Sequence, residues 1–87
     1  MNNDNQKKRG LTERNKLHLA LAAIGYNNSE IGKLLHNSIG TVKKTLGAVY
    51  MKLNVKDRTC AVSTAWKTGI LNAEYIDAVI AEYGIKR

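Results

Sequence analysis

The segment 29–53, SEIGKLLHNSIGTVKKTLGAVYMKL, limits the possible folds more strongly than any other part of the chain. Residues 30–35 predict a short helix with one apolar face, and residues 36–38 predict a three-residue turn. After Ser38, apolar residues recur at steps of three and four up to Leu53, which predicts a longer helix capped by this serine. A short helix, a tight turn and a longer helix are typical of a helix-turn-helix arrangement.

The longer helix is predicted to have two different faces. Its core stripe is expected to consist of Ile39, Val42, Leu46, Val49 and Leu53. The opposite face is expected to carry Gly40, Lys44, Gly47 and Met51, flanked by Thr41 and Lys43. Glycines on the exposed face of a helix lower the stability of that helix. Their presence here favours the close approach of another surface to the helix backbone. The alternative is neutral sequence drift that exposed positions tolerate.

A helix is also predicted before this segment, from a Thr12 cap to Gly25. Its core face is expected to consist of residues at helical spacing, namely Leu17, Ala20, Leu21 and Ile24. The next, short helix is expected to begin at a Ser29 cap. Gly32 within that short helix favours a close crossing of the two motif helices, because it has no side chain.

Two helices are predicted after the motif, over residues 58–68 with a cap at Asp57 or a neighbouring residue, and over residues 73–83 after Asn72. One side of the first carries Ala61, Val62, Ala65 and Trp66, and its small residues permit close helix packing. The second has a broad apolar stripe formed by Tyr75, Ile76, Val79, Ile80 and Tyr83. This stripe can be buried on its own domain or on a second chain. Burial on a second chain is favoured because the preceding four helices already form a complete unit.

Composition supports one small all-α domain. The chain has 87 residues, no proline and no alternating run of Val, Ile and Thr, so strands are not expected. One cysteine, Cys60, excludes an internal disulfide and fits a reducing cytoplasm. The longest apolar run, residues 19–24, is too short to span a membrane. Residues 1–10 are polar and unpatterned, and we expect a flexible basic tail there.

Positive charge is concentrated around the second helix of the motif. The formal net charge is +7, and residues 37–58 carry five basic side chains against one acidic side chain. Residues 59–87 carry equal numbers of both signs. A localised basic patch favours a polyanionic partner, and a merely solvated basic surface is the alternative.

The reactive side chains do not indicate an enzyme. His18, His36 and Cys60 do not fall at metal-ligand spacings, and no glycine-rich phosphate loop or nucleophile motif is present. We therefore expect no catalytic residue, no metal and no cofactor. Both histidines are expected to be structural or solvent-facing, and Trp66 to anchor the core or a dimer interface.

Four sequence blocks resemble the LuxR/GerE-type helix-turn-helix DNA-binding domain: LTER at 11–14, SEIGKLL at 29–35, S-x-x-TVK at 38–43 and KLNVKDRTCAV at 52–62. Each block alone is weak, but the ordered set fits the family without a gap over residues 11–71. The resemblance implies a four-helix bacterial DNA-binding domain, to which residues 72–87 add a C-terminal helix. It also implies sequence-specific transcription regulation, with the third helix in the major groove.

The resemblance also assigns individual residues. It implies that three residues of the third helix face bases: Lys43, Lys44 and Gly47. It implies DNA-phosphate contacts for Ser38, Thr41, Lys52 and Arg58. It implies dimerisation through the fourth helix, at Ala61, Val62, Ala65 and Trp66, and we expect the fifth helix to add Ile76, Val79, Ile80 and Tyr83.

The chain departs from the family pattern at four positions. Asn15 stands where the family usually has glutamate, which weakens the expected capping box with Thr12. Asn37 replaces an apolar turn residue, so a looser or differently hydrogen-bonded turn is expected. Thr45 replaces a frequent histidine and Gly47 replaces a longer side chain, so the family's base preference is not transferred to this chain.

The short segment before the domain predicts a stand-alone regulator without a receiver or ligand-sensing domain. The expected partners are double-stranded DNA and a second copy of the chain, in the cytoplasm and associated with the nucleoid. The alternative hypothesis is a protein-interaction module that binds another regulator or RNA polymerase through the same fold. In that case the fifth helix would be the docking surface.

Overall fold

The computed structural model describes residues 10–86, which form five helices and no strand. The helices are α1 (Glu13–Ile24), α2 (Asn28–Leu35), α3 (Ile39–Leu53), α4 (Arg58–Thr68) and α5 (Ala73–Tyr83). The predicted all-α fold class is therefore confirmed. Apart from Gly10, the expected basic tail lies outside the described residues. None of the described helices is long and apolar enough to cross a lipid bilayer.

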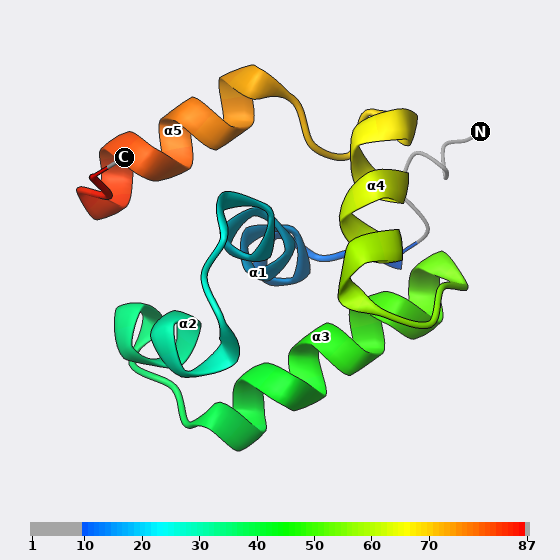
Figure 1. The fold of residues 1–87 in the computed structure, drawn as a ribbon, viewed down its shortest axis with the longest axis horizontal. Helices are drawn as coiled ribbons and strands as arrows, with labels where there is room; N and C mark the ends of the chain where they lie inside the picture. Colours follow the sequence, from blue (N-terminus) through cyan, green and yellow to red (C-terminus); the bar gives the residue numbers. More distant parts are fainter. Residues whose placement is uncertain (1–9, 87) are drawn as a thin grey trace.

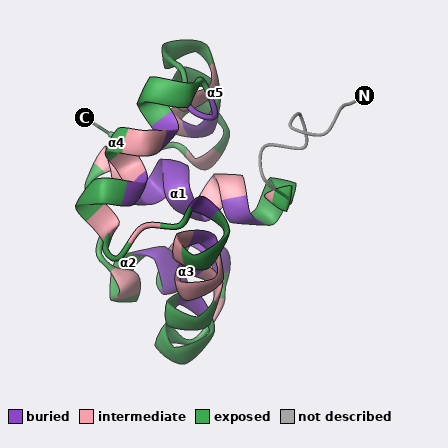
Figure 2. Ribbon diagram, turned by 90° about the vertical axis from the view of Figure 1, so that its right-hand side faces the viewer, coloured by how far each residue is buried: buried purple, intermediate pink, exposed green. Residues whose placement is uncertain are grey.

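Helix α1 lies at the centre, and the other four helices are arranged around it (Figure 1). Residues 18–22 of α1 are all buried (Figure 2), because several helices cover it from different sides. The predicted one-sided stripe on α1 was therefore incomplete. Two of its members, Leu17 and Ile24, are only partly buried.

The predicted caps of four helices are confirmed: Thr12, Ser38, Asp57 and Asn72. The predicted start of α2 at Ser29 was wrong, because Asn27 is the cap. Oδ1 of Asn27 accepts from the Glu30 N–H at 2.8 Å, and the Asn27 N–H donates to Oε1 of Glu30 at 2.8 Å. This reciprocal pair is a complete capping box.

The expected weakening of the capping box on α1 was also wrong. The Thr12 N–H donates to Oδ1 of Asn15 at 3.1 Å, and the Asn15 N–H donates to Oγ1 of Thr12 at 3.0 Å. Asparagine can take the place of glutamate here because its side-chain amide oxygen also accepts the hydrogen bond from the Thr12 N–H.

The turn between α2 and α3 is closed by backbone hydrogen bonds. His36 adopts the left-handed conformation with φ 60°, and the Asn37 N–H donates to the Gly32 carbonyl at 2.8 Å. A Cβ on Gly32 would lie 2.6 Å from the Asn37 carbonyl oxygen. The turn backbone, rather than the expected helix crossing, therefore requires this glycine, and it sets the position of α3 relative to α2.

The stripe of α5 packs inside the chain, against α1. Val79 is buried, and four residues are partly buried against the same core: Tyr75, Ile76, Ile80 and Tyr83. The Nζ atom of Lys16 on α1 lies 4.2 Å from the centre of the Tyr75 ring, a cation–π contact that joins the two helices. Of the two destinations that the sequence left open, the structure of the single chain shows packing on its own domain, and four of the five stripe residues stay partly exposed.

Candidate nucleic-acid interface

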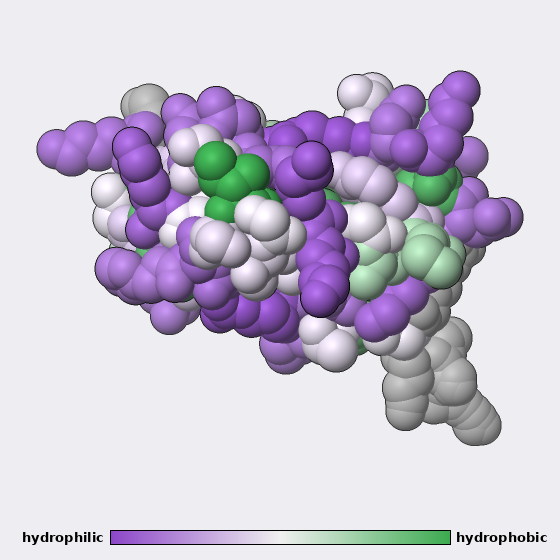
Figure 3. Space-filling model, turned by 90° about the horizontal axis from the view of Figure 1, so that it is seen from below, coloured by the Kyte–Doolittle hydropathy of each residue, from purple (hydrophilic) through white to green (hydrophobic). Residues whose placement is uncertain are grey.

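Helix α3 lies across the molecule from α5, and its two faces differ (Figure 1). Four of the five predicted stripe residues are buried: Val42, Leu46, Val49 and Leu53. The outward face contains the exposed residues Gly40, Thr41, Lys43, Lys44 and Met51, with Gly47 partly exposed. The side of the molecule on which α3 lies is mainly hydrophilic, with small hydrophobic patches (Figure 3).

Ile39 departs from its prediction as a core residue. Its side chain is 51% exposed, although its spacing matches the buried stripe. It is the first residue of α3, at the edge of the bundle. Periodicity identifies a face of a helix but not the point at which the neighbouring helices end, so the exposure of Ile39 could not be predicted from the spacing.

The two lysines of the outward face have no partner within the chain. No hydrogen bond or ion pair within residues 10–86 involves the ammonium group of Lys43 or Lys44. Both side chains are exposed and follow each other in the second turn of a 15-residue helix. Their charges are therefore available to a ligand outside the chain.

The two outward glycines are not required by the fold. A Cβ on Gly47 would meet no atom within 4 Å, and one on Gly40 would meet only Oγ of Ser38, at 3.8 Å. Neither glycine has a positive φ, so the backbone does not require one either. The helix backbone is thus open to a close-fitting surface at both positions.

The start of α3 offers polar groups for an anion. Oγ of Ser38 accepts from the Thr41 N–H at 3.1 Å and donates to Oγ1 of Thr41 at 3.0 Å. The Thr41 hydroxyl accepts this bond, so its own hydrogen remains free for an external acceptor. The first turn of α3 contains no acidic residue, so no side-chain charge there opposes an anion at the positive end of the helix dipole.

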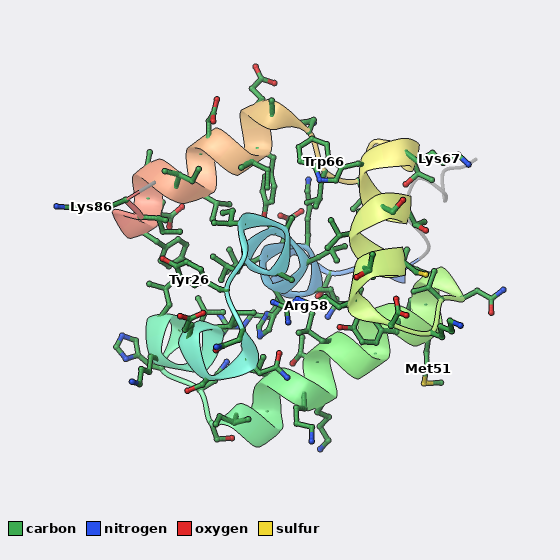
Figure 4. All side chains as sticks on the ribbon, viewed as in Figure 1. Tyr26, Met51, Arg58, Trp66, Lys67 and Lys86 are labelled. Carbon is green, nitrogen blue, oxygen red and sulfur yellow. The ribbon has the colours of Figure 1, made fainter. Side chains whose placement is uncertain are left out.

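Lys52 and Arg58, the other two residues predicted to contact DNA phosphates, do not lie at the start of α3. The Nζ atom of Lys52, in the last turn of α3, donates to Oδ1 of Asn15 at 2.9 Å and to the Gly10 carbonyl at 3.1 Å. Arg58 lies at the start of α4, on the side that faces α1 (Figure 4). The structure thus places Ser38 and Thr41 at the start of α3 beside the lysine face, Lys52 in the last turn of the same helix, and Arg58 on α4.

Three residues of the predicted dimer surface belong to the chain's own core. Ala61 and Ala65 are fully buried and Val79 is 4% exposed. Such side chains have almost no surface to offer to a second chain, so they are removed from the predicted set. Val62 is partly exposed, and Trp66 is 45% exposed and projects from α4 (Figure 4).

His18 and Cys60, two of the potentially reactive residues, take part in local hydrogen bonds of the fold. His18 is fully buried, with Nδ1 2.9 Å from the Arg14 carbonyl oxygen, and burial lowers its pKa. The Cys60 N–H donates to Oδ1 of Asp57 at 2.9 Å, which lowers the pKa of that carboxyl, whereas Asp57 raises the pKa of the Cys60 thiol. No group of His, Cys, Asp and Glu within residues 10–86 could hold a metal ion.

The short α2, the hydrogen-bonded turn and the free basic face of α3 define a helix-turn-helix protein. Residues 9–65 match the family of bacterial regulatory proteins known as the luxR family, also called GerE. The chain therefore belongs to the LuxR family, as its motifs predicted.

Similar curated proteins are the response regulator protein VraR of Staphylococcus aureus, of Staphylococcus saprophyticus and of Staphylococcus epidermidis. Each is 43% identical over 61 residues, which is 70% of this chain and 29% of the relative. The chain therefore matches less than a third of the length of these relatives. No solved structure gives a significant match.

Proposed function

We propose that this chain is a sequence-specific transcription regulator that binds double-stranded DNA as a homodimer, with α3 in the major groove. One observation carries the proposal: α3 has an outward face with two unpaired lysines and two glycines that the fold does not need. Membership of the LuxR family of regulatory proteins supports it independently.

The chemistry of this face suits the edges of guanine. Lys43 and Lys44 carry only hydrogen-bond donors, and guanine presents two acceptors, O6 and N7, in the major groove. The small residues Gly40 and Gly47 let the helix backbone approach the bases more closely than longer side chains would. Ser38 and Thr41 suit a phosphate beside the start of α3, because a free hydroxyl hydrogen and the helix dipole both favour an anion.

A homodimer follows from the size of the site. One recognition helix contacts only a few base pairs, so useful specificity requires two half-sites about one helical turn, or 10 base pairs, apart. Two copies related by a two-fold axis would meet such a site with identical contacts.

The alternative, a module that captures another regulator or RNA polymerase through α5, has less support. That reading needs an exposed apolar stripe on α5. Val79 is instead buried and the other stripe residues pack against α1. The outward residues of α5 are small or charged: Ala73, Glu74, Asp77, Ala78, Ala81 and Glu82.

The test is a fluorescence anisotropy titration with two duplexes, one selected by the protein from a random pool and one of random sequence. The wild-type chain should bind the selected duplex at least about a thousandfold more tightly, with affinity that falls as salt rises. Lys44→Ala should reduce this preference, whereas Lys33→Ala, an exposed lysine on α2, should not. Failure of the wild type to bind either duplex at micromolar concentration would refute the proposal.

A further inference from the structure

Met51 is a large apolar side chain that the fold leaves in water. It is 82% exposed, more than Ile39 and Trp66, the other exposed large apolar residues of the described chain. It is not among the apolar residues that pack against the core, and it projects from α3 away from the bundle (Figure 4). The packing of the chain therefore does not explain why a methionine stands at this position.

Met51 lies on the same face of α3 as the unpaired Lys44. It follows Lys44 by seven residues, which is within about 20° of two full turns of an α-helix. The two side chains therefore project in nearly the same direction, about 10 Å apart along the helix axis. Gly47 lies between them on this face and has no side chain, so it leaves a gap between two long ones.

The gap at Gly47 lets one ligand reach both side chains. A Cβ at this position would meet no atom within 4 Å, so the fold leaves the gap open to the outside. A duplex that approaches the helix backbone at Gly47 would have Lys44 on one side of the closest point and Met51 on the other. Both side chains could then extend to base edges in the same major groove.

The two side chains call for different groups on the bases. Lys44 has only hydrogen-bond donors, whereas Met51 has an apolar thioether. Among the groups that base pairs present in the major groove, the C5 methyl of thymine is the apolar one. A contact between this methyl and Met51 is favourable because it removes apolar surface of both groups from water. The unbranched methionine side chain can also adapt its conformation to the position of the methyl group.

The helix end that carries Met51 is held in place by its neighbour in the sequence. The Nζ atom of Lys52 donates to Oδ1 of Asn15 at 2.9 Å and to the Gly10 carbonyl at 3.1 Å. These bonds tie the last turn of α3 to the start of α1. The position of Met51 relative to the rest of the outward face is therefore set before a ligand binds, as specific recognition requires.

We propose that Met51 contacts the C5 methyl group of a thymine in the major groove and is a specificity-determining residue of this chain. This inference rests on the proposed function and extends the reading face beyond Lys43, Lys44 and Gly47. The rise of seven helical residues matches about three base pairs of about 3.4 Å each. We therefore expect this thymine about three base pairs from the guanine that Lys44 contacts, in each half-site.

Deoxyuridine tests the contact directly, because it lacks only the methyl group of thymidine. The probe is the duplex that the wild type selects from a random pool, with each thymine replaced in turn, and fluorescence anisotropy measures the affinity. At one position in each half-site, the replacement should weaken binding of the wild type about fourfold, the equivalent of one buried methyl group. A selected motif without thymine, or a motif in which no replacement changes the affinity, would overturn the proposal.

Variants assign the methyl contact to Met51. Met51→Ala and the polar Met51→Gln should remain folded by circular dichroism, because the side chain is exposed, and should bind the thymine and deoxyuridine duplexes equally. Met51→Leu keeps an apolar side chain and should retain most of the difference. Lys56→Ala, at an exposed position in the loop after α3, is the control and should keep the full difference. If Met51→Ala and Met51→Gln distinguish the two duplexes as the wild type does, another residue contacts the methyl group and the proposal is wrong.

The same measurements separate this inference from the proposed function. If the wild type binds neither a selected nor a random duplex at micromolar concentration, both proposals fail. If the wild type prefers the selected duplex and Lys44→Ala reduces that preference, but no deoxyuridine replacement changes the affinity, only the Met51 contact fails.

Discussion

The Nζ atom of Lys52, in the last turn of α3, lies 2.9 Å from Oδ1 of Asn15, in the first turn of α1. The same oxygen accepts the N–H of Thr12, and the lysine also donates to the carbonyl of Gly10. One amide oxygen thus completes a helix cap and binds the far end of the proposed reading helix. The position of α3 is therefore set at both ends, here and at the turn after α2.

Replacement of Asn15 should reveal this double role. Asn15→Ala removes the oxygen that accepts both the Thr12 N–H and the Lys52 ammonium, and it keeps the backbone N–H bond to the Thr12 hydroxyl. We therefore expect a loss of about 1–3 kcal/mol in the free energy of unfolding. Asn15→Asp keeps both bonds and should be at least as stable as the wild type, because its charge also favours the helix start and the lysine. Urea unfolding at pH 7 measures both. Lys52→Met removes the bond between the two helices and keeps the capping box, so an unchanged stability in Lys52→Met would show that the Lys52 bond adds nothing.

His18 should make the stability depend on pH. Burial lowers the pKa of His18 below its usual 6.5, the Arg14 charge acts in the same direction, and the hydrogen bond to the Arg14 carbonyl opposes both. The Nε2 atom is buried without a hydrogen-bond partner. The unfolded chain therefore takes up a proton near pH 6.5 that the folded chain does not, and stability should fall as the pH drops below this value.

The slope should not exceed about 1.4 kcal/mol per pH unit, the limit for one proton. Urea unfolding between pH 5.5 and about 7.5 measures it. His36→Gln, at an exposed position, should keep the wild-type slope, whereas His18→Leu should lose most of it. An unchanged slope in His18→Leu would assign the effect to other groups.

Three glycine-to-alanine variants should change the stability of the fold in different directions. Gly32→Ala should destabilise the fold, by about 1–3 kcal/mol, because its Cβ would lie 2.6 Å from the Asn37 carbonyl oxygen. Gly40→Ala and Gly47→Ala should stabilise α3 by up to about 1 kcal/mol, because alanine is the better helix former and both positions have room. We expect Gly47→Ala to weaken specific DNA binding while it raises the thermal midpoint. Higher stability with unchanged DNA affinity would show that this glycine is tolerated drift.

Val79 tests the packing of α5 on α1. Val79→Ala should destabilise the domain by about 1–3 kcal/mol, because it leaves a cavity in the core. The loss should not depend on protein concentration, since the contact lies within one chain. Ala78→Gly, at the adjacent exposed position, is a control that changes helix propensity only. A Val79→Ala effect that appears only at concentrations where the chain dimerises would place the stripe between two chains instead.

The caps and starts of most helices could be predicted from local sequence patterns. Ser38, Asp57 and Asn72 are short polar residues directly before apolar periodic segments, and each is the cap of its helix. The start of α2 was misplaced because Asn27 and Ser29 are both good caps. Only Asn27 has an acidic residue three positions later to complete the capping box.

Tertiary relationships were less predictable. Helix α1 has no single apolar stripe because four helices surround it, so periodicity could not identify His18 as a core residue. The destination of the α5 stripe was open for the same reason, since a pattern identifies an apolar face but not its partner. The lysine face of α3 could be named from spacing and family resemblance. The bond from Lys52 to Asn15 joins positions too far apart in sequence for any local pattern to reveal.

The most direct test of DNA reading by α3 is selection of bound duplexes from a random pool, with the wild type and Lys44→Ala in parallel. The proposal predicts a two-fold symmetric motif for the wild type, with guanine in each half-site and half-site centres about one helical turn apart. Lys44→Ala should relax the preference at one or two of those positions. No enriched motif with the wild type, or an identical motif with Lys44→Ala, would contradict the assignment of this face to sequence-specific DNA recognition.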